Sequence, residues 1–291
     1  MNIKEYFARI SYKGPQECLD LETLTAILQH HIRSVPFEGL SIHCGESIKL
    51  DLEPIYDKIV KQNRGGWCME NNHLLFWVFQ TMGYDISLLG AYVFNPLQDT
   101  YGKDMNHLLL KVVMDDKVYI VDGGFGIAYQ IWQPMELVSG KDQPQAPGIF
   151  RFTEDNGVWY FDKLKRKQHI IDADNPCSDS PKDMTCKKVF SFTLQPQTID
   201  EFRLINKYLQ TASDSLFVNK SICSLQTTSG FQVLIGWTFT EVTYNYKDNI
   251  DLVKITTLTD EEVDKMLQER FNIRLDKKLV PINTRLTPVL F

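Results

Sequence analysis

The sequence predicts an α+β fold with a helical N-terminal third, a central antiparallel sheet or barrel, and a mixed C-terminal third. Three observations predict it. Apolar residues recur at helical spacing up to residue 83, and from residue 84 β-branched and aromatic runs bounded by turn residues replace them. The 291 residues, 43% of them hydrophobic and 23% charged, are typical of a soluble globular protein. That length allows roughly two packed units with a buried cleft between them.

Helices are expected in the first third over residues 21–32, 52–62 and 69–82. Asp20 precedes the first helix as a plausible N-cap, because its carboxylate can accept from the free N–H groups of the first turn. The pair Gly65-Gly66 follows the second helix as part of its terminator. The third is apolar around most of its circumference and ends at Gly83, which predicts a buried helix.

Strands are expected in the middle third over residues 86–94, 107–114 and 117–121, and in a hairpin over 149–161. Asp155-Asn156-Gly157 supplies the turn of that hairpin. Residues 170–183, in which Asp, Asn, Pro and Ser dominate, are expected to form a loop. The last third mixes strands over 189–194 and 231–246 with helices over 198–209 and 259–271.

The charge pattern and the cysteines bound the function. The formal net charge is -6, and acidic and basic residues are interspersed, which argues against a nucleic-acid partner. The N-terminus has no apolar signal region, and no run approaches the roughly 18 apolar residues of a membrane span. The six cysteines are therefore expected to be reduced thiols of a cytoplasmic protein. No metal is expected, because no second pair at zinc spacing accompanies His43 and Cys44.

Cys68 is the first candidate for chemistry. It follows Gly65-Gly66-Trp67 directly and stands at the start of the predicted buried helix. Free backbone N–H groups and the helix dipole at such a position favour the thiolate over the thiol. The alternative is that Cys68 is a small buried apolar residue, as many cysteines are. The glycine pair and the helix start favour the nucleophile.

A thiolate nucleophile needs an imidazole and a group that orients it. His107 opens one predicted strand, and Asp122 follows the next. If Asp115-Asp116 forms a two-residue turn, Asp122 lies opposite Leu109, and His107 lies one diagonal step away on the same face. A turn at Asp116-Lys117 keeps His107 and Asp122 on the same face but doubles the offset between them along the strands. A three-residue loop would place the two side chains on opposite faces. The alternative is that His107 only starts a strand and Asp122 caps a glycine-rich turn.

These motifs resemble those of the arylamine N-acetyltransferase family in order and spacing. The resemblance is carried by Arg64-Gly65-Gly66-Trp67-Cys68, Met105-Asn106-His107-Leu108-Leu109 and Val121-Asp122-Gly123-Gly124-Phe125-Gly126, and it extends along the whole chain. It is close enough to suggest a vertebrate-type member. It implies a papain-like triad of Cys68, His107 and Asp122 on three parts: a helical bundle (1–83), an antiparallel β-barrel (84–192) and an α/β lid with a C-terminal tail (193–291).

The resemblance also implies an activity and further site residues. Acetyl-CoA would load Cys68, and an arylamine or hydrazine would then take the acetyl group, which is a ping-pong order. Arg64 would pair with Glu38 to brace the catalytic loop. Family members line the acceptor pocket with residues that match Phe125, Ile127, Tyr129 and Val93. Residues that would hold CoA are Lys103, Tyr208, Ser215 and Thr287.

Some of these positions leave alternatives open. Val93 fits a barrel core as well as a pocket wall. Ile127 is branched and apolar and cannot pair a carboxylate, which argues against a preference for carboxylated arylamines. Asp104 and Asp214 stand where small neutral residues are expected, and they would repel the CoA phosphates.

Two other classes of function remain. The same triad serves a papain-like peptidase or thioesterase, because the pocket decides whether water or an amine attacks. A binding protein that keeps the fold without catalysis is the third class, and the presence of all three triad residues argues against it. We expect a monomer that takes a small-molecule acceptor and has no membrane partner.

Overall fold

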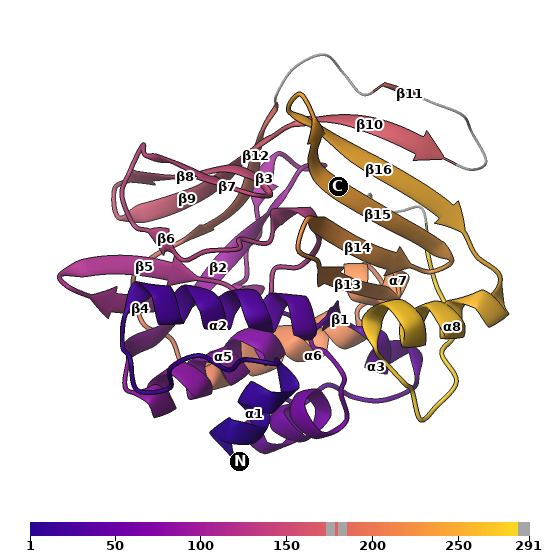
Figure 1. The fold of residues 1–291 in the computed structure, drawn as a ribbon, viewed down its shortest axis with the longest axis horizontal. Helices are drawn as coiled ribbons and strands as arrows, with labels where there is room; N and C mark the ends of the chain where they lie inside the picture. The colour runs from indigo at the N-terminus through magenta and orange to yellow at the C-terminus, as the bar shows by residue number, and fades with distance from the viewer. Residues whose placement is uncertain (173–177, 180–184, 285–291) are drawn as a thin grey trace.

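The computed structural model describes residues 1–172, 178–179 and 185–284. Figure 1 shows the N-terminal helices gathered along the lower side of the molecule, with the strands above them. These helices are α1 (Ile3–Arg9), α2 (Leu21–Ser34), α3 (Leu40–His43), α4 (Leu52–Tyr56) and α5 (Cys68–Met82). The C-terminal half adds α6 (Arg203–Thr211), α7 (Leu216–Asn219) and α8 (Asp260–Phe271).

The three helices predicted for the first third are present, with two differences in detail. As expected, Asp20 caps α2 by accepting from the N–H of Thr23 at 2.7 Å, and Gly83 ends α5 with a φ of 105°. Helix α5 begins at Cys68 itself. The predicted second helix changes pitch, because α4 continues into a π-helical turn, η1 (Asp57–Lys61).

Antiparallel pairing among the described residues builds one sheet in the order β6-β5-β4-β2-β12-β9-β8-β7, with β3 on the side of β2. Its strands are β2 (Asp85–Asn95), β3 (Thr100–Tyr101), β4 (His107–Met114), β5 (Lys117–Val121), β6 (Met135–Glu136), β7 (Asp142–Gln145), β8 (Gly148–Asp155), β9 (Val158–Lys165) and β12 (Thr185–Phe192). The end strands β6 and β7 meet through the side-chain amide of Gln143, which donates to the carbonyl of Glu136 at 2.8 Å and accepts from its N–H at 3.0 Å. The sheet is thus a nearly closed barrel, as predicted.

The β4–β5 hairpin has the expected two-residue turn. Asp115 and Asp116 both have positive φ, 48° and 60°, which suits the twist of a tight hairpin. Leu110 pairs with Val121, and this is the predicted register. The strand ends at Val121, so Asp122 lies just beyond it.

A second sheet has the order β1-β13-β14-β15-β16-β10-β11 in the described part of the chain. Its strands are β1 (Phe37–Glu38), β10 (Lys167–Asp172), β11 (Ser178–Asp179), β13 (Ile222–Gln226), β14 (Gly230–Ile235), β15 (Thr238–Lys247) and β16 (Ile250–Thr257). The loop predicted over 170–183 is wrong for its first residues, because Ile170 pairs with Val253 in a parallel ladder of β10 and β16. This distant pairing overrides the local turn composition.

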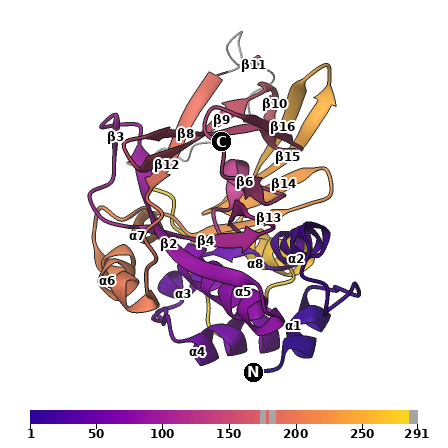
Figure 2. The same cartoon turned by 90° about the vertical axis from the view of Figure 1, so that its left-hand side faces the viewer.

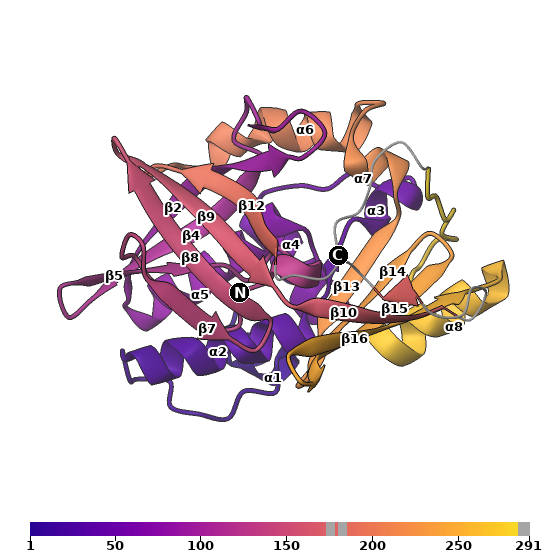
Figure 3. The ribbon, with the colours of Figure 1, turned by 90° about the horizontal axis from the view of Figure 1, so that it is seen from above.

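The two sheets and the helices form layers that position α5, the helix that begins with Cys68. Helix α5 packs beneath β2 and β4, as Figure 2 shows. Helix α8 covers the second sheet, with Val263, Leu267 and Phe271 packed against Leu234 and Phe239. Figure 3 shows the barrel and the second sheet side by side, with α8 at the outer edge. Strand β1, from the N-terminal part, is the edge strand of the second sheet.

Candidate active site

Cys68 is the first residue of α5 and is held there by a close-packed loop. A Cβ at Gly65 would come within 2.0 Å of the carbonyl oxygen of Pro36, and one at Gly66 within 2.6 Å of the Glu70 Cβ. Only glycine allows the backbone to pass this closely. The loop therefore fixes Cys68 at the helix N-terminus, where it is 6% exposed.

His107 and Asp122 form a buried pair beside Cys68. The imidazole Nε2 and the carboxylate Oδ2 are 2.6 Å apart, and the residues are 2% and 3% exposed. The Cys68 side chain lies close enough to the same imidazole to influence its charge, and its thiol donates to the backbone carbonyl of Asn106 at 3.9 Å. Since Nε2 is paired with Asp122, Nδ1 is the ring nitrogen that is left to interact with Cys68. Burial alone would lower the pKa of His107, but the Asp122 carboxylate and then Cys68 outweigh it and raise that pKa to about 10.

Asn72 fixes the other oxygen of Asp122, and the sequence analysis missed it. Its amide donates to Asp122 Oδ1 at 2.9 Å and to the carbonyl of Leu108 at 2.6 Å. Its own oxygen accepts from the N–H of Gly123 at 2.8 Å. The available signal was spacing, because Asn72 follows Cys68 by four residues and so lies on the same face of the helix.

Gln130 holds the loop that follows Asp122, and it was also missed. Its side-chain oxygen accepts from the N–H groups of Phe125 and Gly126, both at 3.1 Å. Its nitrogen donates to the backbone carbonyls of Asp122 and Ile131. One amide thus ties the end of β5 to the loop that carries the predicted acceptor residues. Nothing in the local sequence distinguishes Gln130.

Of the predicted acceptor residues, Phe125 contacts the imidazole, and Tyr129 and Val93 neighbour residues that contact it. The ring of Phe125 packs edge-on against His107, with centroids 4.9 Å apart, and the ring of Tyr129 lies 6.1 Å from that of Phe125. Phe190 contacts both His107 and Phe125, at 5.4 Å and 5.6 Å, and pairs with Val93 in the barrel. The sequence analysis did not single out Phe190.

Ile127, the fourth acceptor residue, has a φ of 45°, which is a strained conformation for a β-branched residue. It starts the short 3-10 helix η2 (Ile127–Tyr129). Two side chains from β13 hold its backbone: Ser224 Oγ accepts from its N–H at 3.2 Å, and Gln226 donates to its carbonyl at 2.9 Å. The second sheet therefore supports the acceptor loop.

The predicted CoA residues have different surroundings. Lys103 is exposed on the segment between β3 and β4. The Tyr208 hydroxyl donates to the Asp214 carboxylate at 2.7 Å, and this hydrogen bond raises the pKa of Tyr208. The Ser215 hydroxyl is buried and caps α7 by accepting from the N–H of Phe217 at 3.2 Å, and it donates to the carbonyl of Leu209 at 2.6 Å. Thr287 lies outside the described residues.

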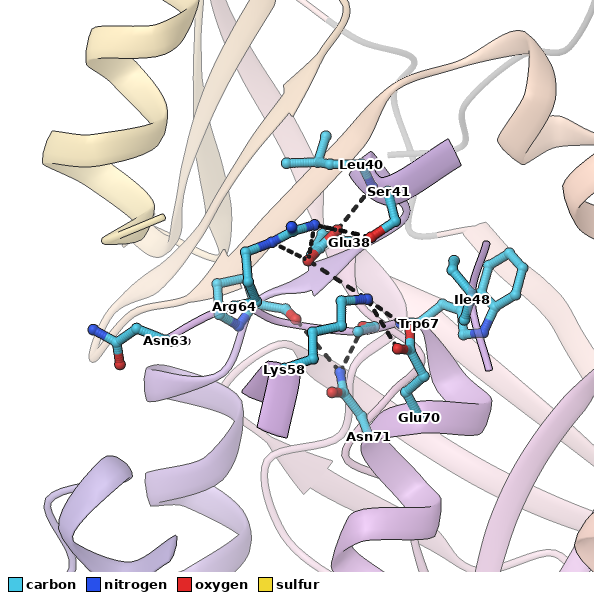
Figure 4. Close-up of polar contacts among 12 residues, drawn as sticks. Glu38, Leu40, Ser41, Ile48, Lys58, Asn63, Arg64, Trp67, Glu70 and Asn71 are labelled. Carbon is cyan, nitrogen blue, oxygen red and sulfur yellow. Dashed lines mark hydrogen bonds and ion pairs between the residues drawn. The ribbon is translucent and has the colours of Figure 1, made fainter. Parts of the chain in front are cut away.

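Arg64 and Glu38 are in contact beside the loop Gly65-Gly66-Trp67 that precedes Cys68, as Figure 4 shows. The guanidinium Nε and Nη2 donate to the two carboxylate oxygens at 3.0 Å and 3.1 Å. Burial opposes ionisation of Glu38, but Arg64 and Lys58 outweigh it and lower the pKa of that carboxyl. Arg9 of α1 secures the backbone next to this pair by donating to the carbonyl of Arg64 at 3.1 Å.

The described residues contain no group of three or more His, Cys, Asp or Glu side chains that could hold a metal ion. Within the same part of the chain, none of the helices has both the length and the apolar character needed to cross a membrane.

Comparison with known proteins identifies the family. The N-acetyltransferase family model matches residues 20–280. The chain is 64% identical to the arylamine N-acetyltransferase, pineal gland isozyme NAT-3, of Gallus gallus, over 98% of each chain. It is 52% identical to arylamine N-acetyltransferase 1 of Homo sapiens, over 97% of each. The Mycobacterium marinum arylamine N-acetyltransferase in complex with CoA has the same fold, with a TM-score of 0.79 at 22% identity over 94% of this chain and 93% of that one. The motifs that resemble this family in sequence thus stand on the family's fold, and the chain belongs to the arylamine N-acetyltransferases, a family of acyltransferases.

Proposed function

We propose that this chain transfers an acetyl group from acetyl-CoA to arylamines and hydrazines by a ping-pong mechanism through an acetyl-Cys68 thioester. The observation that carries the proposal is the chain of contacts Cys68–His107–Asp122 at the start of α5. A nucleophile, a base and a group that orients the base are what covalent acyl transfer requires.

In the first half-reaction, the Cys68 thiolate attacks the carbonyl carbon of acetyl-CoA. Backbone N–H groups at the start of α5 are available to stabilise the negative oxygen of the tetrahedral intermediate. The carbon–sulfur bond to CoA then breaks, and the imidazolium of His107 gives its proton to the departing CoA thiolate. Asp122 keeps the ring in the orientation that allows this transfer.

In the second half-reaction, the amine nitrogen attacks the acetyl thioester, and neutral His107 takes the proton that the amine loses. Collapse of the intermediate forms the amide and breaks the bond to Cys68. The thiolate and the imidazolium are restored, so protons and electrons balance over the cycle.

We assign the acceptor side to the aromatic residues next to the imidazole. Phe125 and Tyr129 offer ring faces and edges to an arylamine, and Val93 and Ile127 add apolar walls. Contact of Phe125 with His107 brings an acceptor bound there close to the base that must take its proton.

We assign CoA contacts to Lys103 and Tyr208, with Thr287 as a further hydroxyl donor. The Mycobacterium marinum relative was solved in complex with CoA, which supports a CoA site on this fold. Because the Ser215 hydroxyl caps α7, we propose that Ser215 supports the CoA site by holding α7 in place.

We propose that the functional parts are divided along the chain as the sequence predicts. Residues 1–83 would supply the nucleophile, 84–192 the base, its orienting carboxylate and the acceptor loop, and 193–291 the lid. We further propose a cytoplasmic monomer. The free thiols of Cys18, Cys44, Cys68, Cys186 and Cys223 fit a reducing compartment.

The test is intact-protein mass spectrometry after mixing with acetyl-CoA alone, with peptide mapping, followed by an arylamine chase. One acetyl group on Cys68 that moves to the amine, and none in a Cys68→Ala variant, is the expected result. An adduct that is lost equally fast without amine would instead indicate a hydrolase. Absence of any adduct would indicate a binding protein.

A further inference from the structure

A second ionised pair, Lys58 and Glu70, stands at the start of the catalytic helix. Glu70 follows Cys68 by two residues and is 1% exposed. Its carboxylate accepts from the N–H of Trp67 at 3.2 Å, which caps the helix. Both carboxylate oxygens also accept from Lys58 Nζ, at 2.9 Å and 3.1 Å (Figure 4).

Lys58 comes from the π-helical turn η1, and its ammonium group lies between two buried carboxylates. Its Nζ is 3.8 Å from Glu38 Oε1 on β1 and 2.9 Å from Glu70 Oε1 on α5. Figure 4 shows this arrangement, with the guanidinium of Arg64 on the far side of Glu38. Because Arg64 already pairs with Glu38 through two hydrogen bonds, Lys58 is the cation that balances Glu70.

Glu70 and Cys68 share the first turn of α5, where a carboxylate would have two opposite effects. A carboxylate near a helix N-terminus stabilises the helix, because the dipole is positive there. The same carboxylate opposes a thiolate on Cys68, because like charges disfavour each other's ionised forms. A cation paired with Glu70 cancels the repulsion of a Cys68 thiolate and leaves the stabilisation of the helix in place.

We propose that Lys58 is a positioning residue for the nucleophile. By neutralising Glu70, it allows a carboxylate to cap α5 while the same helix end stabilises the Cys68 thiolate. The inference rests on the proposed role of Cys68 as the nucleophile.

The effect of the Lys58–Glu70 pair on Cys68 can be measured as a change in pH dependence, given the charged groups around the pair. Glu70 faces Lys58 from η1 and, farther off, Glu38 from β1 and Arg64 from the catalytic loop. Burial raises the pKa of Glu70, and Lys58 acts against that rise. Removing Lys58 therefore leaves the Glu70 carboxylate without its paired cation, two residues from Cys68. On the other side of Cys68 stands His107, paired with Asp122, and these residues remain unchanged in the experiment.

The surroundings favour folding of variants at this site. Lys58 and Glu70 line a surface hollow of about 420 Å³, and the Lys58 side chain is 14% exposed. Water can therefore reach a glutamine placed at position 58 and satisfy its amide.

The experiment measures the pH dependence of Cys68 alkylation by iodoacetamide in the full chain, with peptide mapping to separate the other thiols. Lys58→Gln should raise the midpoint by about half to one pH unit, and Glu70→Gln should lower it by a similar amount. The double variant, with a neutral pair, should return close to the wild-type midpoint. Lys61→Gln is the matched control. It removes a cation from the same turn, but from an exposed pair with Asp57, and should change nothing.

Opposite shifts of the two single variants require a charge effect, because a loss of packing alone would move both in one direction. Shifts in the same direction, or no shift in either, would overturn the proposal. If circular dichroism shows that Lys58→Gln is unfolded, Glu70→Gln and the double variant still have distinct expected midpoints. Alkylation uses no acetyl-CoA, so the midpoints remain informative even if Cys68 proves not to carry an acetyl group.

Discussion

Replacing Asn72 with alanine tests whether the catalytic helix sets the orientation of Asp122. The Asn72 side chain is fully buried and makes three hydrogen bonds, to Asp122 Oδ1, to the Leu108 carbonyl and from the Gly123 N–H. Two of them join neutral groups and cost about 1 kcal/mol each when lost, and the one to a carboxylate costs about 2 kcal/mol. The expected decrease in the free energy of unfolding is therefore about 4 kcal/mol.

Activity should fall beyond what the loss of stability explains. Asp122 keeps its bonds to His107 and to the N–H of Gly124, but its Oδ1 loses one of two donors. A slightly misplaced imidazole is expected to lower kcat/KM by about 10–100-fold. Asn72→Asp keeps the shape and places a second carboxyl 2.9 Å from Asp122 Oδ1. Two carboxyls this close share a proton, so activity should become strongly pH-dependent.

Urea unfolding and steady-state acetyl transfer measure the two effects separately. Asn206→Ala is the control: Asn206 is also buried, but it lies on α6 and donates to the Ile48 carbonyl at 3.0 Å. It should lose about 1 kcal/mol and keep its kcat/KM. If Asn72→Ala unfolds at the same urea concentration as Asn206→Ala and turns over like the wild type, the reasoning about Asp122 is refuted.

Three further outcomes follow from single residues. Ile127→Arg should raise kcat/KM for carboxylated relative to neutral arylamines about tenfold, because a guanidinium pairs a carboxylate; an unchanged ratio would place Ile127 outside the acceptor site. Burial lowers the pKa of His31 to about 3, so the unfolded state alone binds a proton below pH 6.5. The free energy of unfolding should then fall by up to about 1.4 kcal/mol per unit as pH drops below 6.5, and urea titrations of His31→Gln should show a shallower slope. The pKa of His107 is raised to about 10, so the effect of pH on stability has the opposite direction. The stability that protonated His107 contributes is complete below pH 6.5 and is lost as pH rises toward 10. If the free energies of unfolding of the wild type and His107→Gln stay parallel from pH 6 to 10, this prediction is contradicted.

Cys68, His107 and Asp122 could be singled out from the sequence because each stands in a local pattern. A glycine pair before a helix marks Cys68, and the two-residue turn at Asp115-Asp116 fixes which residues of the hairpin share a face with His107. Asn72 and Gln130 could not be predicted with equal ease. Their hydrogen bonds join elements that only the tertiary fold brings together, and a buried amide has no periodic signature.

Sequence reasoning failed where local chemistry and tertiary use differ. Ile170 stands in a segment rich in turn residues, yet it pairs with a strand some eighty residues later. Lys58 and Glu70 look like ordinary surface charges of two separate helices until the π-helical turn brings them together.

The edge strand β1 has a consequence for how the protein is made. Glu38 pairs with Cys223 of β13, and its N–H also donates to the carbonyl of Gly66 at 3.1 Å, two residues before Cys68. At a translation rate of about 5–20 residues per second, β13 is synthesised about 10–40 s after β1. The loop that holds Cys68 therefore acquires its final support late in synthesis. On the ribosome, Cys68 should therefore reach its final surroundings only when most of the protein has been made.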